Sequence, residues 1–241
     1  MASSAGNPPS PLLSSSLKPP KLTLHTYYRS SCSARLRIAL NLKHLAYDSA
    51  PVNILKDEQE SPKFKALNPS CSVPVLIIHS RNNMKDTVLT QSIAALEYLD
   101  EAYPDIGPAL LPSEDEVLAR AHVRELVQII ASDIQPVTNS RVLNRVSDTQ
   151  EWNKFFTRRG LLAYENLAKL TAGKFSVEDE ITLADVCLVP ACWNAQRFGV
   201  DLTEFPIINR IFKEMEEMKA VKKAHWKSQP DTPEDMRNGA H

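Results

Sequence analysis

Hydrophobic and polar positions along this chain first become regular near residue 21. The run LTLHTYY at 22–28 is typical of a strand, and the next stretch repeats apolar residues every four positions, as on one face of a helix. Later runs rich in β-branched residues predict further strands, the last of which leads into a second helix. The predicted strands lie at 22–28, near 47–52, at 73–80 and from 87, with helices over 31–43 and near 92–103. The order is therefore βαβ followed by ββα.

The second half of the chain has helical periodicity almost throughout. A polar, proline-rich stretch at 104–116 separates it from the strands and indicates a domain boundary. Strands with helices, followed by helices alone, predict an α/β domain over 21–105 joined to an all-α bundle over 114–228. Residues 1–20 and 229–241 are expected to be tails. The predicted helical stretches are about 114–146, 150–171, 182–196 and 206–223.

Composition limits the classes of function that this fold could serve. The net charge of −1, from 28 basic and 29 acidic residues, provides no positive field for a nucleic acid. No run of 18 apolar residues could span a membrane, and the six glycines form none of the patterns that bind NAD or ATP phosphates. The four cysteines and six histidines lack metal-binding spacing. We therefore expect a soluble, cytoplasmic protein with reduced thiols and no metal.

Hydroxyl and thiol side chains gather where the first predicted strand leads into the first helix. Ser30, Ser31 and Cys32 stand at the amino end of that helix, whose unpaired N–H groups and dipole favour an anion. A thiolate is such an anion, and this environment can lower a thiol pKa from about 8.5 to roughly 3.5–7.5. The alternative is that Ser30 or Ser31 only caps the helix, and position alone favours that interpretation.

Two later segments could complete a binding site. Pro74 opens a strand and its imide can be cis, while Val73 leaves a backbone N–H and C=O free to pair with an extended peptide. Gln91 and Ser92 open the second helix, where a hydroxyl and backbone N–H groups can bind a carboxylate. A strand-starting proline and a helix cap are the simpler interpretations, and each is adequate for its segment taken alone.

Taken together, these segments resemble the glutathione transferase family, and more narrowly its zeta class. The resemblance covers about residues 21 to 238. It implies a thioredoxin-like first domain, a helical second domain, glutathione as cofactor and a homodimer. The segments that carry it are RSSCSARLRIAL at 29–40, ALNPSCSVPVL at 66–76, QSIAALEYLDE at 91–101, IQP at 134–136, DEITLAD at 179–185, CLVP at 187–190, NAQRFGVDL at 194–202 and QPDTPEDMR at 229–237.

The resemblance also implies roles for individual residues. Ser30 would donate a hydrogen bond to the glutathione sulfur and hold it as a thiolate, with Ser31 and Cys32 as catalytic neighbours. Arg35 and Arg197 would bind the carboxylates of a small dicarboxylate substrate. The implied glutathione contacts are Ser30, Ser31, Cys32, Ser33, Ala34, Arg35, Gln59, Val73, Pro74, Gln91, Ser92, Gln135 and Asn139.

The activity implied by the resemblance is glutathione-dependent isomerisation of maleylacetoacetate to fumarylacetoacetate, a step of tyrosine and phenylalanine catabolism. The thiolate adds to the conjugated double bond, the resulting single bond rotates, and elimination returns glutathione. One alternative is a zeta-class transferase acting on xenobiotics or α-haloacids, which would share every glutathione contact. Another is a non-catalytic binding module on the same fold, although such a module would have no need of Ser30, Val73-Pro74 or Gln91-Ser92.

Four features depart from the family pattern, one of which is Ser70-Cys71-Ser72, where a glycine or a bulkier polar pair is usual. Ala34 stands where an aromatic residue or histidine is usual, and Glu178 replaces a common glycine. The loop at 79–90 is also longer than usual. These changes could alter the shape of the electrophile pocket, but they leave the glutathione motifs intact.

Two features of the second half are expected to serve the fold. Thr182-x-x-Asp185 is typical of a capping box, in which the two side chains satisfy N–H groups at the start of a helix. We assign it no part in catalysis. Cys187 and Cys192 lie in an apolar stretch and are expected to be packed.

Overall fold

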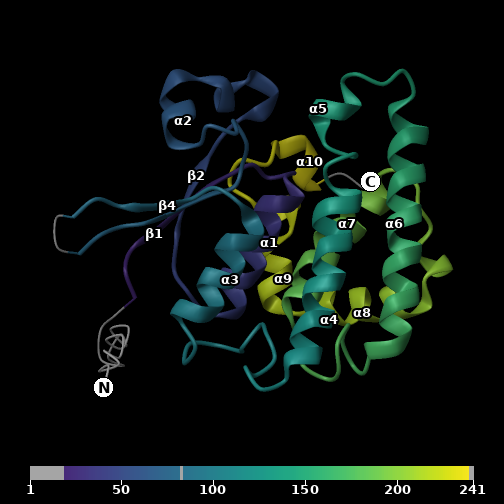
Figure 1. Cartoon of the computed structure of the whole chain (residues 1–241). Helices are drawn as coiled ribbons and strands as arrows, with labels where there is room; N and C mark the ends of the chain where they lie inside the picture. Colours follow the sequence, from purple (N-terminus) through teal and green to yellow (C-terminus); the bar gives the residue numbers. More distant parts are fainter. Residues whose placement is uncertain (1–18, 82–83, 239–241) are drawn as a thin grey trace, which may run out of the picture.

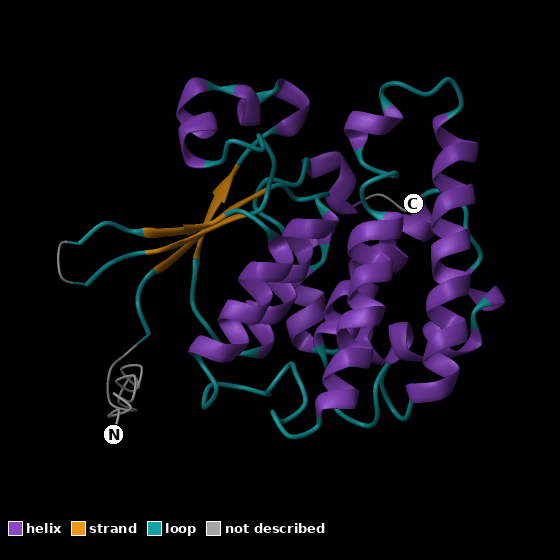
Figure 2. Cartoon of the chain, in the orientation of Figure 1, coloured by secondary structure: helices purple, strands orange, loops and turns teal. Residues whose placement is uncertain are grey.

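The computed structural model of the chain describes residues 19–81 and 84–238. Most of the predicted amino-terminal tail, residues 1–18, lies outside the described residues, as do residues 239–241. The strands gather in one sheet on one side of the molecule and helices fill the other side (Figures 1 and 2). None of the described helices combines the length and the apolar character needed to cross a membrane.

Four short strands form a mixed sheet in the order β2-β1-β3-β4. They are β1 (Leu22–Thr26), β2 (Asp48–Pro51), β3 (Val75–Ile78) and β4 (Thr87–Leu89). β1 pairs in parallel with β2 and antiparallel with β3, and β3 pairs antiparallel with β4. The parallel pair is joined through α1 (Ser31–Leu42), and α3 (Ser92–Ala102) follows β4. The predicted βαβ and ββα order is confirmed.

From Val117 onward the described regular structure is helical, apart from one isolated bridge between Ala172 and Glu178. The predicted helix over 114–146 is wrong in its continuity, because Pro136 has no N–H to extend the ladder and Asn139 caps a new helix. The remaining elements are η1 (Ile54–Lys56), η2 (Glu58–Glu60), α2 (Pro62–Leu67), α4 (Val117–Gln128), the π-helical turn η3 (Ile129–Ile134), α5 (Ser140–Leu143), α6 (Thr149–Thr171), α7 (Leu183–Arg197), η4 (Leu202–Glu204), α8 (Pro206–Glu217), α9 (Lys219–Ala224), η5 (Trp226–Ser228) and α10 (Glu234–Asn238).

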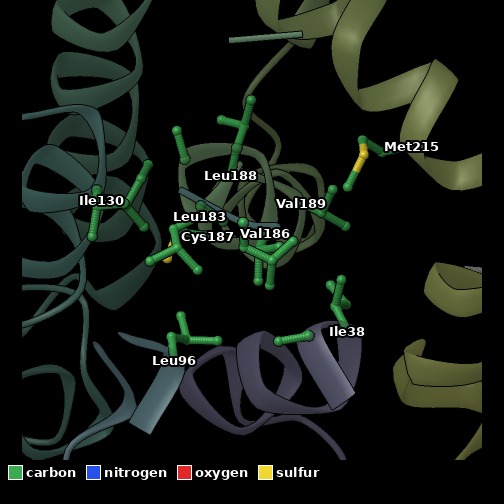
Figure 3. Close-up of a cluster of buried hydrophobic side chains, with 14 of the residues drawn as sticks. Ile38, Leu96, Ile130, Leu183, Val186, Cys187, Leu188, Val189 and Met215 are labelled. Atoms are coloured by element: carbon green, nitrogen blue, oxygen red, sulfur yellow. The ribbon is translucent and has the colours of Figure 1, made fainter. Parts of the chain in front are cut away.

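Helix α7 is the centre of the core. Its residues 183–192 are all buried, as expected for a helix that is apolar around most of its circumference. Ile38 from α1, Leu96 from α3 and Met215 from α8 lie around it (Figure 3). Cys187 and Cys192 are fully buried there, which confirms their expected packing. Because α1 and α3 pack on this core, their amino ends are held in fixed positions relative to the helical half.

The amino end of α7 is closed by its own side chains. The Thr182 hydroxyl accepts a hydrogen bond from the Ala184 amide at 3.3 Å, and the Asp185 carboxylate accepts one from the Thr182 amide at 2.8 Å. The other Asp185 oxygen accepts the Ser176 amide at 2.9 Å. The predicted capping box is confirmed, and its carboxylate is fully buried. This group therefore has a structural role.

A tight turn precedes that helix and explains one departure from the family pattern. Glu178 has a φ of +57°, in the left-handed region where a side chain is unfavourable and glycine is preferred. Gly173 faces it so closely that an added Cβ would lie 2.8 Å from the Glu178 carbonyl carbon. The turn therefore requires a glycine at 173, whereas at 178 it tolerates a strained glutamate.

Candidate active site

Ser30 is the N-cap of α1, and its cap is only partly closed. Its Oγ accepts a hydrogen bond from the Ser33 amide at 3.1 Å, and the first backbone bond of the helix runs from Ala34 to the Ser30 carbonyl at 2.9 Å. The Ser31 and Cys32 amides come before that bond, and no acidic residue lies in the first turn. The capping interpretation and the anion-binding one are compatible, because a hydroxyl that accepts one hydrogen bond can still donate its own proton.

Helix α3 also begins with an open amino end. Gln91 is its N-cap but makes no side-chain capping bond. The first backbone bond runs from the Ala95 amide to the Gln91 carbonyl at 3.0 Å, so the first-turn amides have no helical acceptor. The Ser92 Oγ accepts a hydrogen bond from Nη1 of Arg35 at 3.1 Å. This end of α3 thus combines backbone N–H groups with a hydroxyl that a cation touches.

The loop before β3 is organised by a buried amide. Asn68 is fully buried, donates to the Ser72 carbonyl at 2.7 Å and accepts the Ser70 amide at 2.9 Å. Val73 lies beyond the β1–β3 ladder, which ends with Val75 opposite His25. The described turn and loop hydrogen bonds include neither its N–H nor its C=O. The Val73-Pro74 bond is cis. Val73 can therefore pair with an extended ligand.

Three of the proposed contacts on α1 lie inside the protein. Ala34 and Arg35 are each 2% exposed, and Ser33 is fully buried. The Oγ of Ser33 and the Nε of Arg35 have no hydrogen-bond partner among the described residues. Arg35 reaches towards Ser92 and away from the helix surface that Ser30 begins. Its hydrogen bond therefore links α1 to the amino end of α3.

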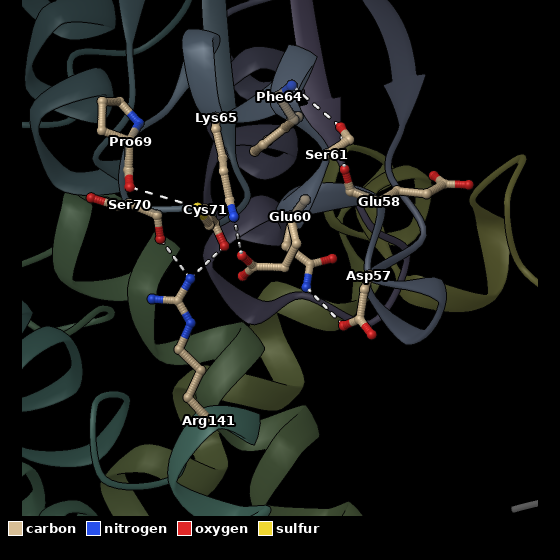
Figure 4. Close-up of polar contacts among 11 residues, drawn as sticks. Asp57, Glu58, Glu60, Ser61, Phe64, Lys65, Pro69, Ser70, Cys71 and Arg141 are labelled. Carbon is tan, nitrogen blue, oxygen red and sulfur yellow. Dashed lines mark hydrogen bonds and ion pairs between the residues drawn. The ribbon is translucent and has the colours of Figure 1, made fainter.

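The helical half faces this loop across α5, and one arginine bridges the gap. Asn139 caps α5 by accepting the Arg141 amide at 3.0 Å, and Gln135 ends the π-helical turn. The Arg141 guanidinium donates to the Ser70 carbonyl at 2.5 Å and also to the Cys71 carbonyl (Figure 4). Sequence reasoning missed Arg141, because a surface arginine in a short helix carries no signal of its partner.

Gln59, the contact expected from the linker, lies in η2. Its Nε2 donates to Asp57 at 3.4 Å, and its buried Oε1 has no partner among the described residues. The Gln59 Oε1 can therefore accept a hydrogen bond from a ligand.

Arg197 has a second arginine beside it. Partial burial, and after it the Arg29 cation, lower the pKa of Arg197. Arg29 lies over the Trp226 ring, 4.5 Å from its centroid. Arg29 directly precedes Ser30, so its guanidinium lies near the amino end of α1, and its charge acts on Arg197. Sequence reasoning missed Arg29 as a charged group of the site, although its position next to Ser30 was a usable signal.

The carboxyl-terminal segment holds this corner in place. Asp231 accepts the Tyr28 amide at 2.8 Å, and Gln229 is buried. Arg37, 1% exposed, donates to the carbonyls of Tyr28 and Ala224. The stretch expected as a tail from 229 thus packs against the start of α1, because its polar groups complete the hydrogen bonds of that turn.

Comparison with known proteins agrees with this arrangement. Residues 29–102 match the glutathione S-transferase N-terminal domain family and residues 153–218 the C-terminal domain family. A maleylacetoacetate isomerase of Aspergillus fumigatus is 54% identical over 90% of this chain and 96% of its own length. The mouse maleylacetoacetate isomerase is 42% identical over 90% of this chain and 98% of its own.

Solved structures extend the likeness to three dimensions. A maleylacetoacetate isomerase from Anaeromyxobacter dehalogenans, with glutathione bound in its active site, superposes with a TM-score of 0.80 at 39% identity. The match covers 90% of this chain and all of that one. A zeta-class maleyl pyruvate isomerase superposes with a TM-score of 0.79 at 38% identity, over 88% of this chain and all of that one. The chain belongs to the glutathione transferase family, within the group of zeta-class maleylacetoacetate isomerases.

Proposed function

We propose that this protein is a glutathione-dependent cis–trans isomerase that converts maleylacetoacetate to fumarylacetoacetate. The observation that carries the proposal is that the described chain presents two open helix ends, at Ser30 and Ser92, and a Val73 backbone with no described hydrogen bond. A tripeptide thiol needs a place for its sulfur, its backbone and a terminal carboxylate, and these three features supply one each. The isomerases that share 54% and 42% of its residues support the reaction.

The residues present fit glutathione. Ser33, Gln59 and Arg35 each keep a buried polar atom without a partner in the described chain, and such atoms favour a polar ligand nearby. Val73 can pair with the cysteinyl unit, and the amino end of α3 can accept the γ-glutamyl end. Gln135 and Asn139 would close the site from the helical half. When bound, glutathione supplies a thiolate that can add reversibly to a conjugated double bond.

Ser30 would act on the sulfur. Its hydroxyl is fixed by the Ser33 amide at 3.1 Å, and its own proton can be donated outward. The first-turn amides of Ser31 and Cys32 and the helix dipole add positive potential at the same point. Together these groups would lower the pKa of a bound thiol and hold it as a thiolate at neutral pH.

Arg197 and Arg29 would act on the substrate. A maleyl dicarboxylate is a dianion, and two neighbouring guanidinium groups can bind it and stabilise the negative charge that develops on addition. Arg35, which the resemblance also assigned to the substrate, is 2% exposed and reaches Ser92. In the proposal the substrate side therefore consists of Arg197 with Arg29.

A conjugating transferase is the second candidate. A relative from Coccidioides immitis, 50% identical over 90% of this chain, is named a probable glutathione S-transferase. The same thiolate could displace a leaving group from an α-haloacid, and every glutathione contact would be shared. The two candidates therefore differ only on the electrophile side.

We further propose a cytoplasmic homodimer. Val117 and Leu118 begin α4, at the start of the helical domain, with 71% and 70% of their surfaces exposed, and exposed apolar side chains of this kind favour a protein interface. Light scattering of the purified chain would give the mass of the assembly, and a monomer at micromolar concentration would contradict this part.

The proposed reaction is tested with purified protein and maleylacetone, a stabler analogue of the substrate, with and without glutathione. Isomerisation that requires glutathione but leaves its concentration unchanged is the expected result. Chloroacetate is assayed in parallel for loss of free thiol. Binding of glutathione without isomerisation, together with thiol consumption, would replace the isomerase by the transferase.

A further inference from the structure

Arg35 is a buried cation without a carboxylate partner. The residue is 2% exposed, and none of the ion pairs between described residues includes it. Its Nη1 donates to Ser92 Oγ at 3.1 Å, and its Nε has no partner among the described residues. The other buried cations differ. Lys43 pairs with Asp100 at 3.1 Å, and Arg37 donates to four oxygens.

Burying such a charge is costly unless an anion or several acceptors compensate for it. The charge of Arg35 acts on the Cys187 thiol, but burial raises the pKa of Cys187 to about 11. At neutral pH that thiol carries no charge and cannot balance the guanidinium. Among the described residues, Arg35 thus has one neutral hydroxyl as hydrogen-bond partner and no carboxylate within ion-pair distance.

The hydroxyl that Arg35 touches lies at an anion-binding position. Ser92 opens α3, an 11-residue helix with no acidic residue in its first turn and no side-chain bond from its cap Gln91. Because Ser92 Oγ accepts from Arg35, its own proton is free to be donated to a ligand. The Arg35 cation and the uncapped first-turn amides of α3 both add positive potential at Ser92, and both therefore favour an anion there.

We propose that Arg35 is a positioning residue that supplies the buried counter-charge for the α-carboxylate of the γ-glutamyl unit, acting through Ser92. The inference rests on the proposed use of glutathione and names the group that recognises one end of it. Arg35 does not touch the sulfur or the electrophile. It orients the Ser92 hydroxyl and adds positive potential at the amino end of α3, and the ligand carboxylate completes the ion pair that the chain lacks.

The test compares two thiols by isothermal titration calorimetry. One is glutathione, and the other is γ-aminobutyryl-cysteinyl-glycine, which lacks only the α-carboxylate. The wild-type chain is expected to prefer glutathione by about 10- to 100-fold, as for a charge-assisted hydrogen bond. Arg35→Met should remove most of this preference by weakening glutathione alone. Arg35→Lys keeps the charge and should retain most of it, and Ser92→Ala should lose part of it.

Arg35→Gln is measured as well, because it keeps a donor for Ser92 without the charge and so covers the case in which Arg35→Met does not fold. Thermal unfolding confirms that each variant is folded. If Arg35→Gln weakens both thiols equally, or leaves the preference unchanged, Arg35 has only a packing role and the inference is wrong. If the wild-type chain binds neither thiol, the proposed function itself fails.

Discussion

Helices α1 and α7 both start after a capping hydroxyl residue, but the amino end of α1 stays open to a ligand, whereas that of α7 is closed by the chain. Each helix starts after a hydroxyl residue, Ser30 or Thr182, that accepts a first-turn amide. At α7 the buried Asp185 carboxylate takes further N–H groups, so the end is closed by the chain itself. At α1 no acidic side chain lies in the first turn. The dipole there is left for a ligand.

This difference shows that a capping hydroxyl alone does not separate a structural helix end from a binding one. The deciding quantity is whether the protein supplies the acceptors for the first-turn amides. In α7 the Thr182 hydroxyl accepts the Ala184 amide and the Leu110 carbonyl accepts the Leu183 amide at 2.8 Å, while the buried Asp185 carboxylate accepts the amide of the cap itself. Where the third residue after the cap is Ser33, as in α1, the end remains open to an anion.

The largest effects are expected when the capping residue of each helix, Ser30 or Thr182, is replaced by alanine. Ser30→Ala should reduce glutathione-dependent isomerisation by about 100- to 1000-fold, since a donor to the reacting anion is lost. Its stability should fall by only about 1 kcal/mol. Thr182→Ala should lose about 1–2 kcal/mol of stability and keep its activity per folded molecule. The measurements are steady-state rates and urea unfolding, and equal activity losses in both variants would end the distinction.

The reactivity of one cysteine in each helix, Cys32 in α1 and Cys187 in α7, also differs between the open and the closed helix. Burial raises the pKa of Cys187 in α7 to about 11, so at pH 8 the thiol is almost wholly protonated and unreactive. Cys32, in the first turn of α1, is partly exposed. Iodoacetamide should modify Cys187 at least about 100-fold more slowly than Cys32, as followed by peptide mass spectrometry. In urea the two rates should converge. Comparable rates in the folded protein would contradict the closed state of α7.

Arg141 tests how far the open site depends on the helical half. Removing its bonds to the Ser70 and Cys71 carbonyls should loosen the loop that carries Val73, and we expect Arg141→Ala to raise the glutathione Kd about 3- to 10-fold. Arg145→Ala is the matched control, since Arg145 is also exposed and near α5 but has no described bond to that loop. The same Kd for both variants would show that the bridge has no effect on binding.

The smallest effect is expected at the turn before α7. Glu178→Gly relieves a φ of +57° and should raise stability by about 1 kcal/mol. Glu180→Gly serves as the control, because Glu180 is exposed and is not among the residues with positive φ. Chemical denaturation measures both. A stability gain at 180 that equals the gain at 178 would contradict the backbone argument.

Much of the fold could be predicted from local patterns. The strand and helix order around α1 and α3 follows from periodicity, and the α7 capping box follows from two residues three apart. The break in the predicted 114–146 helix was missed because apolar periodicity continues through Pro136, although a proline and a new cap interrupt the hydrogen bonds.

By itself, the sequence determined which helix ends carry hydroxyl groups, which segment precedes a proline and which family the motifs resemble. These are local properties, because capping, turns and strand starts depend on residues a few positions apart. Only the tertiary structure decided that Arg35 donates to Ser92, that Arg141 reaches the loop before β3 and that the charge of Arg29 acts on Arg197. Such contacts join residues distant in sequence, and packing around α7 decides which polar side chains meet and which are left without a partner.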